Sequence, residues 1–388
     1  MEELIYVDRK NTNCVKWDGQ TGMFGEEGLH AMWVADMDIR APKGVVDALK
    51  EYVEQGVFGY YKIPDAYNEA FIKWEREHHG FEVQKEWIRF SPGVVCAFHW
   101  FVKALTEPGD AVIVNTPVYY PFFHAVESND RKLICSDLIN ENGKYRIDYD
   151  DFEKKIVEND VKAYILCSPH NPAGRVWRED ELKTLFEICK KHNVYVISDE
   201  IHHDLVFGDH PHIPSLSVGD YADRMVAITA PSKTFNLAGG QNSIVIIPDE
   251  KIRGKWDAFV DGIRIEMGNP FGYIAAEAAY RTGSDWLEAV KAQIQENVNY
   301  VRETLERELP GVIVSPLEGT YLCWIDLKAY VPADQVKEVV QKKCHLAVDF
   351  GDWFGGERFQ TFIRMNLATS LENVKIGVDA LVEGIKSL

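Results

Sequence analysis

The sequence lacks three features that would place the protein in a membrane or on a nucleic acid: a long apolar run, a secretion signal and an excess of basic charge. A membrane-spanning helix needs about 20 mainly apolar residues, and no stretch of the 388-residue chain approaches that length. The first residues, MEELIYVDRKN, lack a basic segment followed by an apolar one, so we expect no secretion signal. The chain has 42 Lys and Arg against 61 Asp and Glu, a net charge of −19 spread along its length. Because such a surface repels nucleic acids and anionic membranes, we expect neither as a partner.

Cysteines are few and show no pattern of a disulfide framework or a zinc site. The seven are odd in number, widely spaced and free of any CxxC pair: Cys14, Cys96, Cys135, Cys167, Cys189, Cys323 and Cys344. This usage predicts reduced thiols and a cytoplasmic location.

The chain is long enough for two or three packing units, and its apolar patterning changes along the sequence. Residues 1–45 form a turn-rich arm that we expect to complete a smaller unit. In residues 46–280, short apolar runs alternate with helical patterns such as 178–192, which predicts a large α/β domain. The predicted strands are Ala111–Asn115, Leu133–Ser136, Ala163–Cys167, Tyr195–Ser198, Met225–Thr229 and Ser243–Ile247.

Nearly continuous apolar strands separated by helices are typical of a parallel sheet covered on both faces. Residues 281–388 differ, because a long helix over 286–308 precedes a few short strands and further helices. The remaining predictions there are strands at 321–325 and 362–366 and helices at 333–343 and 371–386. This pattern predicts a smaller α+β domain at the C-terminus.

Several unusual segments follow the apolar runs, where ligands collect in an open α/β sheet. The segment Ser91–Val95, SPGVV, leads into a helical pattern, so its free backbone N–H groups could bind a phosphate, although an ordinary loop has the same sequence features. In PVYYP, Tyr119 could stack on a flat heteroaromatic ligand or be a plain packing aromatic. In SPHNPAG, Asn171 could donate a hydrogen bond to a phenolic oxygen, but Asn-Pro turns are common in loops.

Two further segments contain ionisable residues after predicted strands. The cluster SDEIHHD at 198–204 raises the question of a metal, but its spacing does not match HExxH, and we favour Asp199 as the partner of a protonated ring nitrogen. Lys233, in TAPSKTF, is either a surface lysine or a desolvated amine that forms a Schiff base. Together the five segments offer a phosphate cradle, a stacking ring, a donor, an acid and an amine, which are the groups that pyridoxal 5'-phosphate (PLP) requires.

The sequence resembles the fold-type I, aspartate-aminotransferase-like PLP enzymes, and most closely the MalY/PatB group of cystathionine β-lyases, or C–S lyases. The resemblance extends over essentially the whole chain. It rests on KWD at 16–18, WVADMD at 33–38, FGY at 58–60, SPGVV at 91–95, CSPHNPAGRVW at 167–177, SDEIHHDL at 198–205, APSKTFNLAGGQ at 230–241 and RMNLA at 364–368. It implies a mostly parallel sheet of the seven-stranded type in a large domain, with a smaller α+β domain.

The resemblance also implies a role for each matching residue. Lys233 would hold the cofactor as a Schiff base and move protons, Asp199 would pair with the pyridinium, Asn171 would bond the phenolic oxygen and Tyr119 would stack on the ring. The backbone around Val94 and Val95, with Ser232, would bind the phosphate, and His202 would lie near the phenolic oxygen. Arg364 would grip the substrate carboxylate, and Tyr60 would reach the phosphate of the neighbouring subunit of a homodimer.

The implied activity is removal of a thiol from cystathionine or a related S-substituted cysteine, and the partner is therefore a small amino-acid substrate. Gln241 stands where transaminases of this class usually have an arginine, and the lyases commonly have glutamine there. An aminotransferase with the same site is the main alternative, and a PLP-binding regulatory protein is a minor one. Residues 368–370, ATS, lack the proline and arginine often found there, and the sequence does not rank the sulfur amino acids or fix the assembly beyond a dimer.

Overall fold

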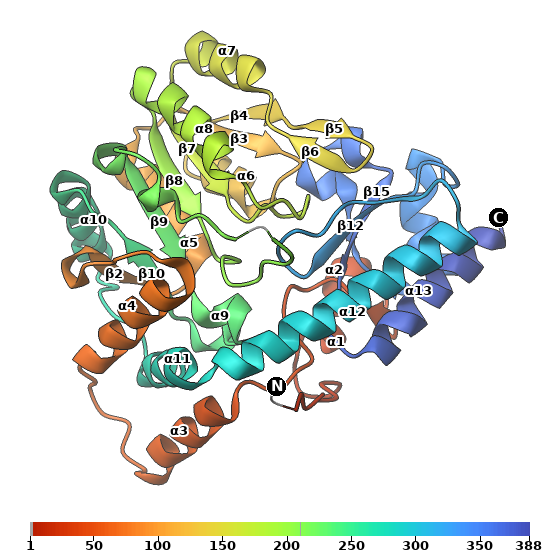
Figure 1. The fold of residues 1–388 in the computed structure, drawn as a ribbon, viewed down its shortest axis with the longest axis horizontal. Coiled ribbons are helices and arrows are strands. Elements are labelled where there is room, and N and C mark those ends of the chain that lie inside the picture. The colour runs from red at the N-terminus through yellow and green to blue at the C-terminus, as the bar shows by residue number, and fades with distance from the viewer. Residues whose placement is uncertain (1–2, 210) are drawn as a thin grey trace.

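A computed structural model describes residues 3–209 and 211–388 and is organised around a seven-stranded sheet (Figure 1). The strand order is β2-β10-β9-β8-β7-β3-β4. Neighbouring strands from β4 to β9 are parallel, whereas β10 runs antiparallel to both β9 and β2. The strands are β2 (Ile88–Ser91), β3 (Ala111–Thr116), β4 (Lys132–Asp137), β7 (Val161–Cys167), β8 (Tyr195–Asp199), β9 (Met225–Thr229) and β10 (Ser243–Ile246). The prediction of a mostly parallel, seven-stranded sheet is confirmed.

The central strands are mainly apolar and almost entirely buried because helices cover both faces of the sheet. Val112 and Val114 of β3 pack on one side with Phe101 and Trp256, from α5 (Val94–Leu105) and α10 (Glu250–Ile263). Ile113, between them, faces the other side, where α7 (Tyr149–Asn159) and α8 (Glu179–Lys191) pack. Successive side chains of a strand point to opposite faces, so both sets must be apolar here.

A second sheet lies beside the first and consists of β11 (Ile313–Val314), β12 (Leu322–Asp326), β15 (Phe362–Asn366) and β14 (Asp349–Phe350), in that order. The short strand β1 (His30–Ala31) of the N-terminal segment pairs in parallel with β13 (Leu346–Ala347), and β5 (Ile139–Glu141) pairs with β6 (Lys144–Arg146). The N-terminal segment thus packs against the C-terminal part of the chain. The domain boundaries near residues 45 and 280 remain predictions.

The other helices surround these sheets. The long helix α12 runs alongside α13, as Figure 1 shows. These helices are α1 (Val15–Asp18), α2 (Gln20–Phe24), α3 (Lys43–Glu54), α4 (Asp65–His79), α6 (Pro121–Glu127), α9 (Pro231–Thr234), α11 (Pro270–Thr282), α12 (Ser284–Glu308) and α13 (Leu371–Lys386). The segment 333–343, predicted as a helix, is helical along its length but of mixed type, with a 3-10 turn at Ala333–Gln335 and a π-helical turn at Glu338–Lys343.

The mixture of helix types in this segment leaves no signature in the spacing of its apolar residues. Val336, Val339 and Val340 are buried in the core, and their three- and four-residue spacing suits several kinds of helical turn equally well. Periodicity therefore located the buried face correctly but could not choose the hydrogen-bonding pattern.

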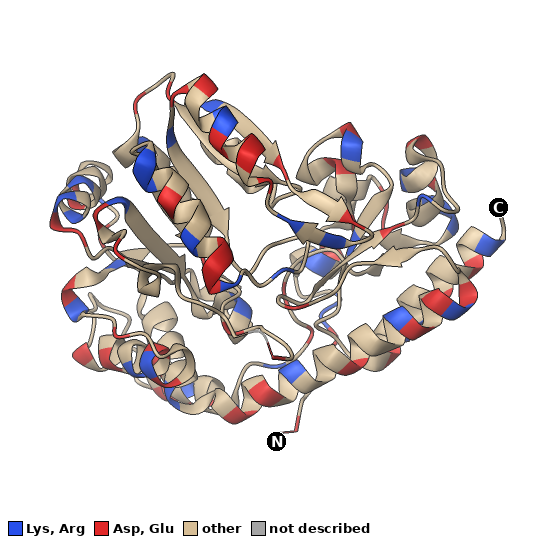
Figure 2. Cartoon of the chain, turned by 45° about the horizontal axis from the view of Figure 1, so that its top comes forward, with Lys and Arg blue, Asp and Glu red and all other residues tan. Residues whose placement is uncertain are grey.

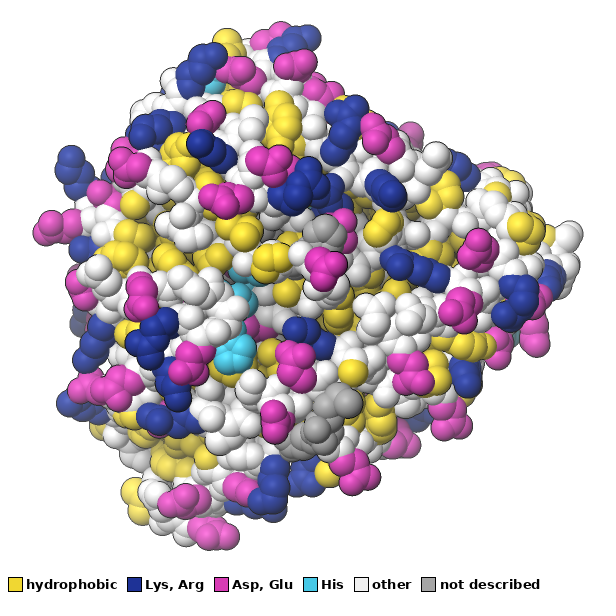
Figure 3. All heavy atoms as spheres, in the orientation of Figure 1, with side chains coloured by type: hydrophobic (Ala, Val, Ile, Leu, Met, Phe, Trp, Pro, Cys, Tyr) yellow, Lys and Arg dark blue, Asp and Glu magenta, His cyan; other side chains and the backbone are white. Residues whose placement is uncertain are grey.

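Acidic and basic residues are interspersed along the outer helices (Figure 2), and their side chains are mixed over the face of the molecule seen in Figure 3. None of the described helices is both long and apolar enough to cross a bilayer.

Candidate active site

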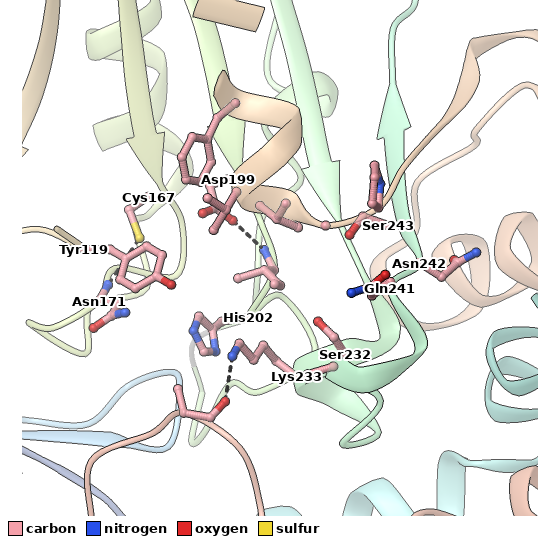
Figure 4. Close-up of a pocket in the computed structure, with 18 residues that line it drawn as sticks. Tyr119, Cys167, Asn171, Asp199, His202, Ser232, Lys233, Gln241, Asn242 and Ser243 are labelled. Atoms are coloured by element: carbon pink, nitrogen blue, oxygen red, sulfur yellow. Dashed lines mark hydrogen bonds between the residues drawn. The ribbon is translucent and has the colours of Figure 1, made fainter. Parts of the chain in front are cut away.

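A cavity of about 180 Å³ opens beyond the carboxyl ends of β7, β8 and β9. Because these strands are parallel neighbours, segments far apart in sequence leave the sheet side by side, and Cys167 is in register with Asp199. Eight predicted site residues line the cavity: Val94, Val95, Tyr119, Asn171, Asp199, His202, Ser232 and Lys233. In Figure 4, Tyr119 and Asn171 lie at one end, Gln241 and Ser243 lie at the other, and Asp199, His202 and Lys233 lie between them.

Asp199 is a buried carboxylate at the end of β8 with little to balance its charge. Its Oδ1 accepts a hydrogen bond from the backbone N–H of Ile201 at 3.1 Å. Burial raises the pKa of Asp199 to about 7, and this N–H and the amine of Lys233 offset the effect only partly. A cation held against this carboxylate would relieve the cost of burying it.

Lys233 lies in the one-turn helix α9, directly after β9 and a short distance from Asp199 along the sheet edge. Its Nζ donates a hydrogen bond to the backbone carbonyl of Ala35 at 2.6 Å. Burial lowers the pKa of Lys233 to about 8, with Arg364 acting in the same sense and the carboxylates of Asp36 and Asp199 opposing it. An amine with this pKa is substantially neutral in mildly alkaline solution and can act as a nucleophile or a base.

Asn171 and Arg364 are joined at one end of the cavity. Arg364, from β15, donates through Nη1 to the side-chain oxygen of Asn171 at 3.0 Å and also pairs with Asp349 of the neighbouring strand β14. Because the oxygen of the Asn171 amide is engaged, its NH₂ group is the part free to donate to a ligand. Arg364 itself is buried and is not among the residues that line the cavity.

The other end of the cavity is formed by the start of α5 and has the character of an anion site. Gly93 precedes the helix, and none of the described side chains caps its first backbone N–H groups. Those of Val94 and Val95 are therefore available to an anion, and the positive end of the helix dipole favours one. Ser232 and Gln241 line the same cavity.

His202 and Tyr119 complete the walls of the cavity. Burial, with the charges of Lys233 and Arg364, holds the pKa of His202 well below its usual range, so its imidazole is neutral. The Nδ1 atom of His202 is buried without a hydrogen-bond partner among the described residues. Burial also raises the pKa of Tyr119 far above its usual value, so this side chain presents a neutral phenol.

Tyr60 is placed differently from the other predicted site residues. Its side chain is fully exposed and does not line the cavity of its own chain. Tyr60 therefore takes no part in the cavity of its own chain.

Sequence reasoning missed several residues of the cavity. Ala35, Phe98, Ile201 and Asn242 line it, and Asp349 holds Arg364 from behind. Ala35 lies in the WVADMD segment and Ile201 in the SDEIHHD segment, and Asn242 directly follows APSKTFNLAGGQ; these segments carried the resemblance, but the three residues were given no role. Phe98 and Asp349 have no such signal, because only the fold brings them to the site.

The groups in the cavity fit PLP. The aldehyde of PLP needs a neutral amine, its ring nitrogen a carboxylate, its phenolic oxygen a donor and its phosphate a set of N–H groups. The cavity holds Lys233, Asp199 and Asn171 for the first three, and the uncapped start of α5 for the last. The orphaned charge of Asp199 is the clearest sign of fit, since a protonated pyridine nitrogen would supply its missing cation.

Comparison with known proteins agrees with this chemistry. Residues 35–381 match the family model of aminotransferase class I and II. The chain is 41% identical to cystathionine β-lyase PatB of Bacillus subtilis (strain 168), with 96% of each chain covered. Cystalysin from Treponema denticola, which contains PLP, superposes with a TM-score of 0.95 at 34% identity, covering 100% of this chain and 99% of that one. A PLP-bound protein from Clostridium difficile 630, provisionally named an aminotransferase, gives a TM-score of 0.95 at 38% identity, covering 98% of each chain. The chain therefore belongs to the aminotransferase class I and II family of PLP-dependent enzymes, in the group that includes PatB.

Proposed function

We propose that the protein is a PLP-dependent carbon–sulfur β-lyase that cleaves cystathionine or a related S-substituted cysteine to a thiol, pyruvate and ammonia. One observation carries the proposal: a buried amine and an unbalanced carboxylate, Lys233 and Asp199, share one cavity in a chain 41% identical to a cystathionine β-lyase. PLP, when bound, withdraws electrons from the α-carbon of an amino acid and makes the α-proton acidic.

Lys233 is the covalent anchor of the cofactor and the base of the reaction in this proposal. With the substrate bound in place of Lys233 on the cofactor, the free Nζ of Lys233 would take the proton from the α-carbon. The electron pair of that bond forms a double bond between the α- and β-carbons while the bond from the β-carbon to sulfur breaks, and sulfur leaves with its electron pair as a thiolate. The ammonium of Lys233 returns a proton to the thiolate, and water hydrolyses the released unsaturated amine to pyruvate and ammonia.

The other predicted residues bind and orient in this proposal. Asp199 keeps the ring nitrogen protonated, the NH₂ group of Asn171 donates to the phenolic oxygen, and Tyr119 stacks on the ring. Arg364 binds the α-carboxylate of the substrate, for which the planar guanidinium is suited by its paired N–H donors. The N–H groups of Val94 and Val95, with the hydroxyl of Ser232, bind the phosphate, and neutral His202 lies near the phenolic oxygen.

We also propose a cytoplasmic homodimer in which Tyr60 contributes to the phosphate site of the partner. Exposed Tyr60 lies in a segment with exposed Val57 and Phe58, and Phe58 packs beside Phe271, which is also exposed. A group of large exposed apolar side chains of this kind is typical of an interface. Sedimentation should give a dimer, and Tyr60→Phe should weaken cofactor retention; a monomer that retains PLP fully would contradict this part.

An aminotransferase is the second candidate, because the family model carries that name and both reactions begin with removal of the α-proton. Gln241 favours the lyase. It lines the cavity at the position where transaminases of this class usually have an arginine, which would add a cation beside the phosphate. A regulatory protein without turnover is a weaker alternative, since Lys233, Asp199 and Arg364 are all present.

The deciding experiment incubates purified, PLP-loaded protein with L-cystathionine in the absence of any keto acid. Equal amounts of pyruvate and free thiol are expected from β-elimination. If neither forms, yet addition of a keto acid allows an amino donor to be consumed, the protein is an aminotransferase.

A further inference from the structure

A buried group of polar side chains lies behind the cavity, on residues to which the proposed reaction gives no task. It consists of Trp74, His79, His203, Asp204 and Thr234, and we refer to it as the Asp204 cluster. The carboxylate of Asp204 is at its centre and is almost completely buried. Asp204 closes the SDEIHHD segment that begins beside Asp199, and Thr234 directly follows Lys233.

Asp204 connects three segments of the chain through hydrogen bonds to both of its oxygens. Its Oδ1 accepts from Nε1 of Trp74 at 2.9 Å and pairs with Nε2 of His79 at 2.8 Å, and both of these residues belong to α4. Its Oδ2 accepts from the hydroxyl of Thr234, in α9, at 2.7 Å. The loop that follows Asp199 is thereby tied to the helix that carries Lys233, and both are tied to α4.

His203 supplies the positive charge that keeps this carboxylate ionised. Its Nε2 lies 3.2 Å from Oε1 of Glu75 and 3.3 Å from Oδ2 of Asp204. Burial opposes a charge on His203, but the carboxylates of Asp204 and Glu75 outweigh burial and raise its pKa to about 10. His203 is thus an imidazolium at neutral pH, and its charge lowers the pKa of Asp204 far below the usual range against the effect of burial.

Glu75, His79 and His203 are also close enough together to hold a metal ion. A metal would need the Nε2 of His203 as a lone-pair donor, whereas two carboxylates already flank that atom and favour its protonated form. The ion pairs of His203 with Glu75 and Asp204 account for the cluster without a metal.

We propose that Asp204 and Thr234 are positioning residues for the reaction. Their hydrogen bond fixes α9 against the loop after Asp199, so that the Lys233 amine and the Asp199 carboxylate face a single bound cofactor. Neither residue lines the cavity. Thr234 therefore acts through Lys233, which precedes it in the sequence, and Asp204 acts through its hydrogen bond with Thr234. The inference rests on the proposed function only in that Lys233 is the cofactor-binding lysine.

The hydroxyl of Thr234 can be removed and restored with little change in volume. Thr234→Val keeps the shape and removes the donor, Thr234→Ala removes donor and bulk together, and Thr234→Ser keeps the donor. Thr304→Val serves as the matched control, because Thr304 is a buried threonine of α12 whose neighbours have no part in the site.

We expect the holoenzyme of Thr234→Ser to keep kcat within about twofold of wild type, since its hydroxyl can still donate to Asp204. Thr234→Val and Thr234→Ala should lose about 10- to 100-fold in kcat with KM little changed, because a small displacement of a reacting group has this effect. The pH midpoint of the visible absorbance of the bound cofactor should shift in the same two variants and in neither Thr234→Ser nor Thr304→Val.

Wild-type kcat and an unshifted midpoint in Thr234→Val and Thr234→Ala would overturn the inference, as would a loss confined to thermal stability. If Thr234→Val does not fold, the comparison is made between Thr234→Ala, which lacks the hydroxyl, and Thr234→Ser, which keeps it. The outcome is separable from that of the proposed function: the kcat comparison is made with whichever amino-acid reaction the wild type performs, and Lys233→Ala tests the lysine assignment by itself.

Discussion

Replacing Asp199 by asparagine removes the negative charge of this side chain without changing the shape of the cavity. The asparagine oxygen can still accept a hydrogen bond from the backbone N–H of Ile201, so we expect the local backbone to keep its conformation. The substitution should therefore have two opposite effects. It should stabilise the protein without cofactor, because it removes a buried and poorly balanced carboxylate, and it should impair the protein with cofactor, because it removes the partner of the ring nitrogen.

The size of the first effect follows from the pKa of Asp199, which burial raises from 3.8 to about 7. A shift of about three units corresponds to roughly 4 kcal/mol, at 1.36 kcal/mol for each unit. The folded protein holds this proton more tightly than the unfolded chain does, so the free energy of unfolding falls as pH rises between about 4 and 7. Asp199→Asn should thus raise the free energy of unfolding of the apoprotein by up to about 4 kcal/mol at pH 8, and by nothing near pH 4.

The second effect is loss of turnover. A neighbouring opposite charge shifts a pKa by one to three units, so the ring nitrogen should lose its proton more easily and kcat should fall about 10- to 1,000-fold. Both effects can be measured on one preparation, by denaturant unfolding of the apoprotein at pH 4 and pH 8 and by pyruvate release from the holoenzyme.

Asp38→Asn is the control, because Asp38 is buried but paired with the buried amine of Lys16 at 2.6 Å. Removing that partner should destabilise the protein at pH 8, since it leaves a buried cation uncompensated. The reasoning is refuted if Asp199→Asn destabilises the apoprotein at pH 8 as Asp38→Asn does, or if its holoenzyme keeps wild-type kcat.

Three further outcomes are expected from the same site. Lys233→Ala should abolish turnover and the visible absorbance of the covalently held cofactor, whereas Lys43→Ala, at an exposed lysine, should leave both intact. An unchanged spectrum in Lys233→Ala would show that this lysine does not hold the cofactor. Arg364→Lys should raise KM about 10- to 100-fold with a smaller change in kcat, because loss of a charge-assisted hydrogen bond costs about 1.5–3 kcal/mol; an unaltered KM would mean that another group binds the carboxylate. Because Lys233 must be neutral to take a proton and burial sets its pKa to about 8, kcat should rise with pH and level off above about pH 8; a flat profile between pH 6 and pH 9 would contradict its role as the base.

The strands of the large sheet could be predicted because their surroundings constrain them strongly. Six apolar runs became β3, β4, β7, β8, β9 and β10, with ends that differ from the predictions by no more than two residues. The seventh strand, β2, escaped notice because Ile88–Ser91 contains an arginine, is only partly buried and pairs along one edge alone. A strand at the edge of a sheet is not forced to be apolar, so its sequence shows no run.

The arrangement around Lys233 shows what sequence patterns cannot supply. The strand order puts the segments after β7, β8 and β9 at one edge, and this much follows from parallel pairing. The carbonyl of Ala35 that accepts from Lys233 and the carboxylate of Asp349 that holds Arg364 come from segments almost 200 and 15 residues away, respectively. Contacts of this kind depend on how the second sheet and the N-terminal segment pack, and no local periodicity reports that packing.

Burial explains why Lys233 and Asp199 have opposite pKa shifts within one cavity. It lowers the pKa of the amine and raises that of the acid, so each group is driven toward its neutral form. PLP resolves both conditions together, since its aldehyde consumes a neutral amine and its ring nitrogen provides a cation for a carboxylate. The Asp204 cluster behind them differs in that its charges are balanced within the protein, by His203 between Glu75 and Asp204. A cluster whose charges are balanced internally can hold Lys233 and Asp199 in place before the cofactor binds. The free energy cost of burying these two groups is offset only when the cofactor is bound.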